Sequence, residues 1–182
     1  MRVIAGSAKG CILKSPKGRK TRPATELVRG AIFSILESVA EDWSSLLDLF
    51  SGSGSLGIEA LSRGVEWVDF VEQEARCCAI IKQNIAKAGF VDYAHVYCCS
   101  VNRALSFLDK EYGIIIMDPP YSSPSIDRTL EQLANSRLVS GNSIVIATHS
   151  KLRPLKSRYA SLNLKKEYHH GDSVIALYRK EG

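Results

Sequence analysis

Four consecutive residues, Asp118, Pro119, Pro120 and Tyr121, carry the most specific chemistry in the sequence. Two adjacent prolines remove two backbone donors and fix two φ angles, so this turn is stiff and its carbonyl groups point in set directions. The exocyclic amine of a nucleobase has two hydrogens, which a carboxylate oxygen and a backbone carbonyl can accept together. The pattern predicts that Asp118 and the Pro119 carbonyl hold a planar amine while Tyr121 stacks on its ring. An ordinary turn at the end of a strand is the structural alternative.

A glycine-rich loop lies earlier in the chain, after the apolar stretch 46–50. Gly52, Gly54 and Gly57 have the G-x-G-x-x-G spacing, which lets a ligand approach the backbone where a strand leads into a helix. Glu72 lies twenty residues beyond Gly52, where a carboxylate can accept both ribose hydroxyls of an adenosine-containing cofactor. The loop alone also fits a tight strand-to-helix turn, and Glu72 is what favours a cofactor site.

The identity of that cofactor depends on Asp48, which comes just before the loop. A carboxylate there would repel the pyrophosphate of a nicotinamide dinucleotide, but it could hold an ammonium group. A dehydrogenase would also need a substrate domain, for which 182 residues leave no room. We therefore expect S-adenosylmethionine as cofactor and S-adenosylhomocysteine as its product. The predicted contacts around the loop are Asp48, Phe50, Ser51, Gly52, Ser53, Gly54, Glu72 and Gln73.

Alternating strand and helix patterns must position these residues, and such alternation is typical of a parallel sheet with crossover helices. Thr25 is a suitable N-cap for the first amphipathic helix. The end of the chain predicts two more strands, paired antiparallel at the edge of the sheet. The predicted helices are 25–39, one that ends at residue 63, 74–88, 102–108 and 125–138. The predicted strands are 46–50, 67–72, 94–98, 113–118, 142–148, 162–168 and 173–178.

Positive charge is concentrated at the two ends of the chain. The net charge is +7 over residues 1–30, −7 over 31–150 and +5 over 151–182. If the two ends meet in the fold, they form a cationic face that suits a polyanion such as RNA. A solvated lysine and arginine surface is an equally good interpretation. The segment 2–23 predicts a small β-hairpin followed by a basic loop. Its candidate RNA-binding residues are Arg2, Lys9, Lys14, Lys17, Arg19 and Lys20.

Composition excludes several classes of protein. Hydrophobic residues make up 45% and charged residues 24%, as in ordinary globular chains. The sequence has no apolar run of about eighteen residues and no signal-peptide pattern, so we expect a cytoplasmic protein without a membrane span. The cysteines lack C-x-x-C spacing, so we expect neither a metal site nor disulfides, and predict that they are small core residues. They are Cys11, Cys77, Cys78, Cys98 and Cys99.

The chain resembles, from end to end, the bacterial small-subunit ribosomal RNA guanine-N2 methyltransferases, a family of the class I, S-adenosylmethionine-dependent type. The matching stretches are Arg2-Val3-Ile4-Ala5-Gly6, Thr21-Arg22-Pro23-Ala24-Thr25, Val28-Arg29, residues 47–54 and 56–64, Val71-Glu72, the turn at 118–121 and Gly171-Asp172-Ser173. The resemblance implies a Rossmann-like α/β fold, with a seven-stranded, mostly parallel sheet whose last strand is antiparallel. It also implies an N-terminal arm (1–24) on a methyltransferase domain (25–182).

By the same resemblance, the substrate is one guanine of 16S rRNA in the small ribosomal subunit, modified by a monomer. The family's threonine-arginine-proline segment helps to close the cofactor site, which implicates Thr21, Arg22 and Thr25. Ala24 stands where the family often has threonine, and this change removes one hydroxyl contact. The acid expected after the third strand is replaced by Cys99 and Ser100, so Ser100 or the backbone must contact the adenine amine.

Two other functions remain open from the sequence. The turn at 118–121 also suits adenine N6, cytosine N4 or a protein glutamine side chain, although asparagine in its first position is more usual for adenine and glutamine enzymes. A protein of a different class, a non-catalytic RNA-binding assembly factor, could keep the fold without turnover. The intact set of Asp48, Gly52, Gly54, Glu72 and Asp118 argues against that second alternative.

Overall fold

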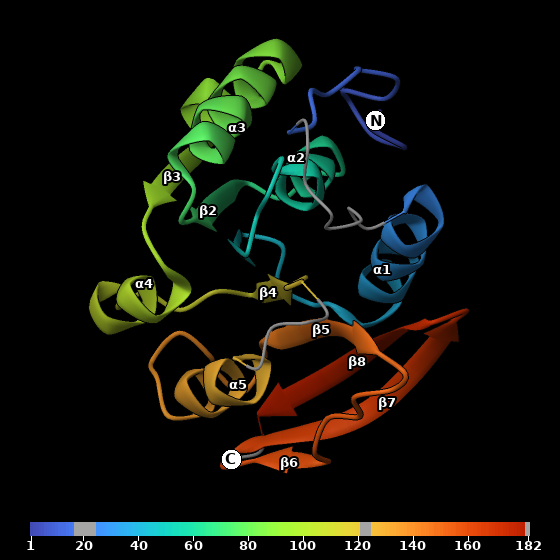
Figure 1. Ribbon diagram of the computed structural model, residues 1–182, viewed down its shortest axis with the longest axis vertical. Helices are drawn as coiled ribbons and strands as arrows, with labels where there is room; N and C mark the ends of the chain where they lie inside the picture. Colours follow the sequence, from blue (N-terminus) through green and yellow to red (C-terminus); the bar gives the residue numbers. More distant parts are fainter. Residues whose placement is uncertain (17–24, 121–124, 181–182) are drawn as a thin grey trace.

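One eight-stranded sheet forms the centre of the molecule, with helices on both of its faces (Figure 1). The computed structural model describes residues 1–16, 25–120 and 125–180. The strand order is β3-β2-β1-β4-β5-β8-β7-β6, and the first five of these strands are parallel. The strands are β1 Ser45–Leu49, β2 Trp67–Glu72, β3 Ala94–Cys98, β4 Ile114–Met117, β5 Ile144–Ser150, β6 Arg158–Tyr159, β7 Leu162–His170 and β8 Ser173–Lys180.

The predicted mostly parallel sheet with an antiparallel last strand is confirmed, because β8 runs antiparallel to β5. The antiparallel pair at the end of the chain is also confirmed, as β7 and β8. The described residues form eight strands, where seven were predicted. The additional strand, β6, has only two residues, which is too short for an alternating pattern to be recognised in the sequence.

The helices divide between the two faces of the sheet. They are α1 Glu26–Val39, α2 Ser55–Ser62, α3 Ala75–Ala88, the 3₁₀ turn η1 Val91–Tyr93, α4 Val101–Phe107 and α5 Ile126–Ala134. The first three helices share one hydrophobic cluster with one face of the sheet, while α4 and α5 share a second cluster with the other face. The central strand β4 is buried along its whole length, as expected for a parallel strand covered on both faces.

Helix α2, which follows the glycine loop, packs very closely on strand β2. A Cβ atom added at Gly57 would lie 2.3 Å from the Phe70 ring, so only glycine allows this approach. The third glycine of the predicted motif therefore sets the distance between helix and sheet.

The N-terminal segment is a loop docked on α2, and the predicted β-hairpin is not confirmed. A single isolated bridge joins Arg2 and Ile12. The backbone donors of Ile4 and Ala5 bind the buried Glu59 carboxylate of α2, at 2.8 and 3.0 Å, and so are not available for a ladder. The two arms of the segment still pair antiparallel over a short stretch, since the Val3 amide donates to the Cys11 carbonyl at 3.0 Å and the Leu13 amide to the Met1 carbonyl at 2.8 Å. The segment therefore has hairpin-like pairing without two regular strands.

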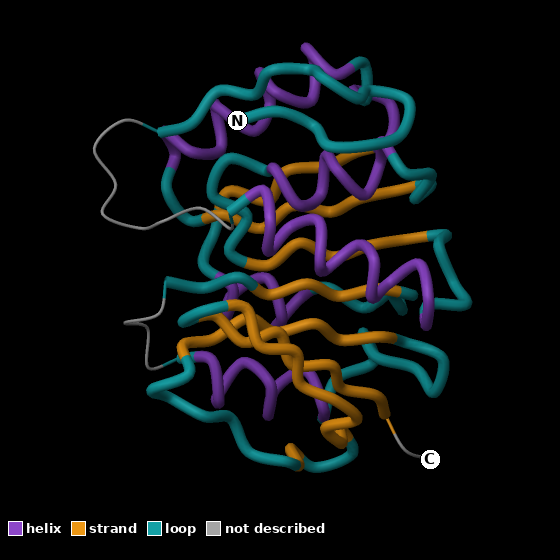
Figure 2. Tube along the Cα trace, turned by 90° about the vertical axis from the view of Figure 1, so that its right-hand side faces the viewer, coloured by secondary structure: helices purple, strands orange, loops and turns teal. Residues whose placement is uncertain are grey.

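The two ends of the chain lie far apart along the long axis of the molecule (Figures 1 and 2). The N-terminal segment packs beside α2 and α3, near the β3 edge of the sheet. Strands β8 and β7 lie beyond β5, toward the opposite edge of the same sheet. Within the described residues, segment 1–16 and strands β7 and β8 are therefore apart and do not form the single cationic face considered from the sequence.

Three further expectations concern membrane spans and cysteines. Within the described ranges, no helix is long and apolar enough to cross a membrane. No disulfide joins the five cysteines. The prediction that they are core residues is right for Cys77 and Cys78, which are buried, and wrong for Cys98, which is exposed at the end of the edge strand β3.

Candidate active site

The candidate site lies where the strand order reverses, between β1 and β4. Leu49 at the end of β1 is in register with Val71 of β2 on one side and with Met117 of β4 on the other. The glycine loop after β1 therefore lies between Glu72 and Asp118, the residues that follow these two partners. In open α/β sheets, ligands bind at this switch point, outside the carboxyl ends of the strands.

The glycine loop has a fixed and strained backbone. Gly52 and Gly54 have φ angles of 58° and 78°, in the left-handed region, and so does Phe50 at 62°. A non-glycine residue held there stores strain that the surrounding contacts must offset. Ser51 supplies such contacts, because its Oγ donates to the Asp48 carbonyl at 2.7 Å and accepts from the Val71 amide at 3.1 Å.

Glu72 shapes the same loop. Its Oε2 accepts from the Gly52 amide at 2.8 Å and its Oε1 accepts from the Glu74 amide at 2.9 Å. The carboxylate is buried and joins the end of β2 to the loop after β1. The residue predicted to contact ribose thus also has a structural role, which its position in the sequence did not reveal.

Asp48 is a buried carboxylate whose hydrogen bonding is incomplete. Its Oδ2 accepts from the Gly57 amide in the first turn of α2 at 3.0 Å, while its Oδ1 is buried with no partner. Burial raises the pKa of Asp48 to about 8; the bond from Gly57 opposes this rise, and the charges of Asp118 and Glu72 add to it. Three carboxyl groups therefore come together at this edge of the sheet, an arrangement that favours a cationic ligand.

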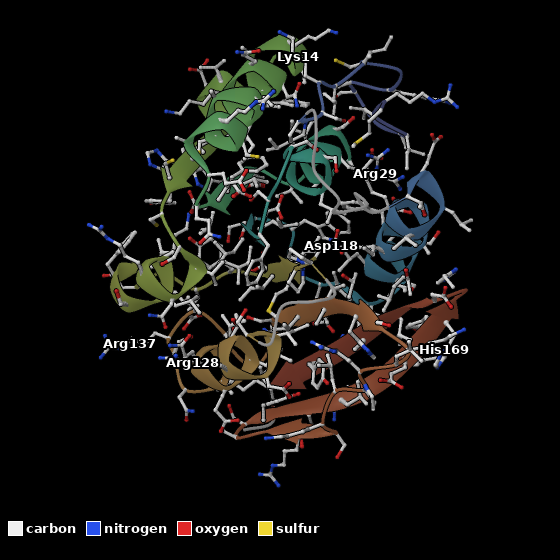
Figure 3. All side chains as sticks on the ribbon, viewed as in Figure 1. Lys14, Arg29, Asp118, Arg128, Arg137 and His169 are labelled. Atoms are coloured by element: carbon white, nitrogen blue, oxygen red, sulfur yellow. The ribbon has the colours of Figure 1, made fainter. Side chains whose placement is uncertain are left out.

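Asp118 lies at the end of β4, near the centre of the molecule (Figure 3). The hydroxyl of Thr148, a fully buried residue of β5, donates to Asp118 Oδ1. Asp118 remains partly exposed, whereas Pro119 beside it is buried. Strand β5 thus holds the carboxylate in one direction, in a residue that is not fully buried.

Three other residues predicted to bind the cofactor have local roles or lie at the surface. Ser100 is exposed and caps α4, since its Oγ accepts from the Arg103 amide at 3.3 Å. Thr25 caps α1 as predicted, accepting from the Val28 amide at 3.2 Å. Gln73 is exposed beside Glu72. The predictions for Thr21, Arg22 and Tyr121 lie outside the described residues.

The candidate RNA-binding residues of the N-terminal segment lie on its surface. Arg2 forms an exposed ion pair with Glu26 at 3.3 Å, and Lys9 is exposed. Lys14, near the top of Figure 3, donates to the Gln83 side chain at 2.8 Å. The other three, Lys17, Arg19 and Lys20, fall outside the described ranges.

Sequence reasoning missed two buried residues that support the site. Thr148 orients Asp118, although it is an unremarkable threonine in an apolar strand. Asn84 of α3 joins the N-terminal segment to the glycine loop: its Oδ1 accepts from the Lys14 amide at 2.8 Å, and its Nδ2 donates to the carbonyls of Lys14 and Ser53 at 3.0 and 2.9 Å. A polar residue on the buried face of an amphipathic helix was the only signal for Asn84.

Across residues 1–16, 25–120 and 125–180, no group of three or more histidine, cysteine, aspartate or glutamate side chains is arranged to hold a metal ion.

The sheet order and the glycine loop after β1 define a Rossmann-like methyltransferase fold. The solved structure described as "Putative methyltransferase yhhF from Escherichia coli" is 26% identical, with a TM-score of 0.88, and the match covers 100% of this chain and 98% of that one. A conserved hypothetical protein of Streptococcus pyogenes is 34% identical with a TM-score of 0.78, over 85% of this chain and 96% of the other.

The chain belongs to the family described as "Conserved hypothetical protein 95", which matches residues 1–179. "Putative rRNA methyltransferase YlbH" of Bacillus subtilis is 35% identical over the full length of both proteins. "Ribosomal RNA small subunit methyltransferase D" of Escherichia coli strain K12 is 28% identical over 100% of this chain and 90% of that protein. The family resemblance inferred from the sequence motifs is therefore confirmed.

Proposed function

We propose that this protein transfers a methyl group from S-adenosylmethionine to the exocyclic N2 amine of a guanine in 16S rRNA of the small ribosomal subunit. The names of its full-length relatives support a ribosomal RNA substrate. The observation that carries the proposal is the Asp118 carboxylate, held by Thr148 at the end of β4 beside the glycine loop.

The residues around the loop fit S-adenosylmethionine. Asp48 Oδ1 is a buried acceptor without a donor, and the cofactor's ammonium group is a donor of the right charge. Glu72 lies at the carboxyl end of β2 beside the glycine loop, where a carboxylate can accept from the ribose hydroxyls of the cofactor. When bound, the cofactor supplies a methyl group on a positively charged sulfur, which leaves as a neutral thioether.

Asp118 and the Pro119 carbonyl act on the substrate amine in this proposal. Both accept hydrogen bonds from the NH2 group, so its lone pair is localised and directed toward the methyl group. Tyr121 stacks on the base. The Asp118 carboxylate can also accept the proton that the nitrogen loses after the new carbon–nitrogen bond forms. Positioning and exclusion of water supply most of the rate, because the methyl group is already activated.

The direct test is Asp118→Ala, assayed by transfer of a radiolabelled methyl group to small subunits from cells that lack this protein. We expect the rate to fall by roughly 10² to 10⁴, because the amine loses its positioned acceptor. The affinity for S-adenosylhomocysteine, measured by calorimetry, should be almost unchanged. Asp92→Ala, at an exposed aspartate in η1, is the control and should be fully active. Full activity of Asp118→Ala would refute the proposal.

The substrate base is tested by mass spectrometry of rRNA nucleosides from cells lacking the protein. The proposal predicts loss of N2-methylguanosine in 16S rRNA and its return with the wild-type chain. Loss of a methylated adenine or cytosine would instead favour another planar amine. An unchanged profile, together with no binding of S-adenosylhomocysteine, would favour a non-catalytic assembly factor.

The N-terminal arm contributes RNA contacts through Arg2, Lys9 and Lys14. Deleting the segment would not test this, because Val3 and Leu13 are buried in the core. The double substitution Arg2→Ala and Lys9→Ala removes two exposed charges and leaves the core residues in place. Each phosphate contact contributes about 0.7 to 0.9 to the slope of log affinity against log salt, so the slope should flatten by up to about twice that amount.

A further inference from the structure

The loop between β5 and β6, residues 151–157, lies at the same edge of the sheet as the candidate site. Strand β5 is parallel to β4, with Ala147 in register with Met117. The next residue of β5, Thr148, bonds the side chain of Asp118. Because β5 continues only to Ser150, the β5–β6 loop begins three residues beyond Thr148, which holds Asp118.

This loop carries positive charge around an exposed apolar tip. Lys151, Arg153 and Lys156 are exposed, and Arg158 follows at the start of β6. Leu152 is 82% exposed, the highest value among the large hydrophobic residues of the described chain that are exposed. Residues 151–158 include no acidic residue.

The backbone of the β5–β6 loop is held in place. The Lys151 amide donates to the Asp172 carbonyl at 3.0 Å, and the Arg153 amide donates to the Ser150 carbonyl at 2.9 Å. The Lys156 amide donates to the Tyr159 hydroxyl at 3.0 Å, while the Lys156 carbonyl accepts from the Tyr178 hydroxyl at 2.8 Å. The loop therefore presents its side chains from an ordered backbone, which lowers the entropy lost on binding.

We propose that the β5–β6 loop is a second RNA-binding element, which contacts the substrate beside the target base. This inference rests on the proposed function. Arg153 and Lys156 bind phosphates, and Leu152 packs on the sugar or base face of a nucleotide next to the one that is methylated. The loop and the N-terminal segment lie on opposite sides of the site along the long axis (Figure 1). The N-terminal segment and the β5–β6 loop thus hold the RNA from two sides.

The test compares two double variants that remove the same charge. Arg153→Ala with Lys156→Ala alters the loop, and Lys165→Ala with Lys166→Ala alters exposed positions on β7, two strands away from β5. For the loop variant we expect the KM for unmethylated small subunits to rise about tenfold or more. The salt slope should flatten by about 1.4 to 1.8, the contribution of two phosphate contacts. The kcat and the affinity for S-adenosylhomocysteine should stay the same. The β7 variant should match the wild type in all four quantities.

Lysine acetylation of the wild-type protein gives a second measurement that needs no variant. Bound small subunits should protect Lys151 and Lys156 from the reagent, and leave Lys165 and Lys166 reactive. Equal protection at both places, or equal effects of the two double variants, would overturn the proposal. Failure of the proposed function is distinguishable, because then the wild-type protein itself would not methylate small subunits.

Discussion

Two buried aspartates on neighbouring strands differ in how completely their carboxylates are hydrogen-bonded. Asp48 of β1 and Asp69 of β2 are each 1% exposed. Asp69 accepts from Trp67 Nε1 at 2.9 Å and Tyr112 Oη at 2.7 Å, and pairs with Lys110 at 2.8 Å. Asp48 accepts one bond, from a backbone amide, and its other oxygen has no partner. Only one of the two carboxylates is left able to receive a new donor.

The surroundings of Asp69 look like a binding site at first. The carboxylate lines a cavity of about 390 Å³ near the amino ends of β2 and β3, together with aromatic side chains. Lys110 lies over the rings of Trp67 and Tyr112, and burial raises the pKa of Tyr112 far above its usual value. Every polar group named here has its partner within the chain. The cavity therefore holds a structural polar cluster.

The comparison shows which property of a buried carboxylate indicates ligand binding. A buried charge is costly unless it is paired, so a protein keeps an incompletely bonded one only where something else compensates. Burial is the same for Asp48 and Asp69, and it does not separate them. The two residues differ in the number of hydrogen-bond donors around each carboxylate. Substitution of Asp48 should therefore lower cofactor affinity, whereas substitution of Asp69 should lower stability.

The largest effect is expected for Asp48→Asn. The asparagine can still accept from Gly57, but its NH2 group would then face the cofactor's ammonium group, donor against donor. A charge-assisted hydrogen bond contributes roughly 1.5 to 3 kcal/mol, so the affinity for S-adenosylhomocysteine should fall about 10- to 100-fold. Calorimetry measures this. The melting temperature of the ligand-free protein should not fall, and unchanged affinity would remove the functional distinction between the two aspartates.

Asp69→Asn should have the reverse effect. An asparagine cannot accept from all three donors or neutralise Lys110, so we expect the free energy of unfolding to fall by about 1 to 3 kcal/mol. Urea denaturation measures the change. The affinity for S-adenosylhomocysteine should equal that of the wild type. A large loss of affinity in a variant that remains folded would show that the cavity participates in function.

The pH dependence of stability provides a third test. The pKa of Asp48 is about 8 in the folded protein and near 3.8 when unfolded, so between these values the native state binds more protons. Its contribution to stability is therefore present at low pH and is lost as pH rises from about 4 to 8, at up to about 1.4 kcal/mol per pH unit. Asp48→Asn should lack this contribution. Cofactor binding, which favours the ionised form, should release protons below pH 8, as seen by calorimetry in buffers of different ionisation enthalpy.

The smallest effect is expected for Thr148→Val. This substitution keeps the shape of the side chain but removes the hydroxyl that orients Asp118. The kcat should fall about threefold to tenfold, or by about 1 kcal/mol in barrier height, because Asp118 keeps its charge and loses only part of its orientation, while cofactor affinity is unchanged. Thr129→Val removes a buried hydroxyl from α5 that donates to the Ser125 carbonyl, and serves as the control. Equal kcat in the two variants would mean that Thr148 does not position the carboxylate.

The sequence by itself determined the order of the elements and the local shape of the site. The predicted ranges for β2 and β3 match the structure, and Thr25 caps α1 as expected. The glycine loop could be recognised because glycine adopts the positive φ angles that Gly52 and Gly54 have, which other residues rarely do. Features that depend on neighbouring residues in the sequence, such as helix caps and glycine turns, can be predicted from the sequence alone.

The tertiary structure alone decided which distant groups satisfy the buried polar side chains. Thr148 and Asp118 are 30 residues apart, Glu59 and Ile4 are 55 apart, and Asn84 and Lys14 are 70 apart. The same kind of contact docks the N-terminal segment on α2, and the packed fold leaves Asp48 Oδ1 without a donor. No periodicity encodes such pairs, because a buried donor or acceptor is satisfied by whatever the packed fold brings within about 3 Å of it.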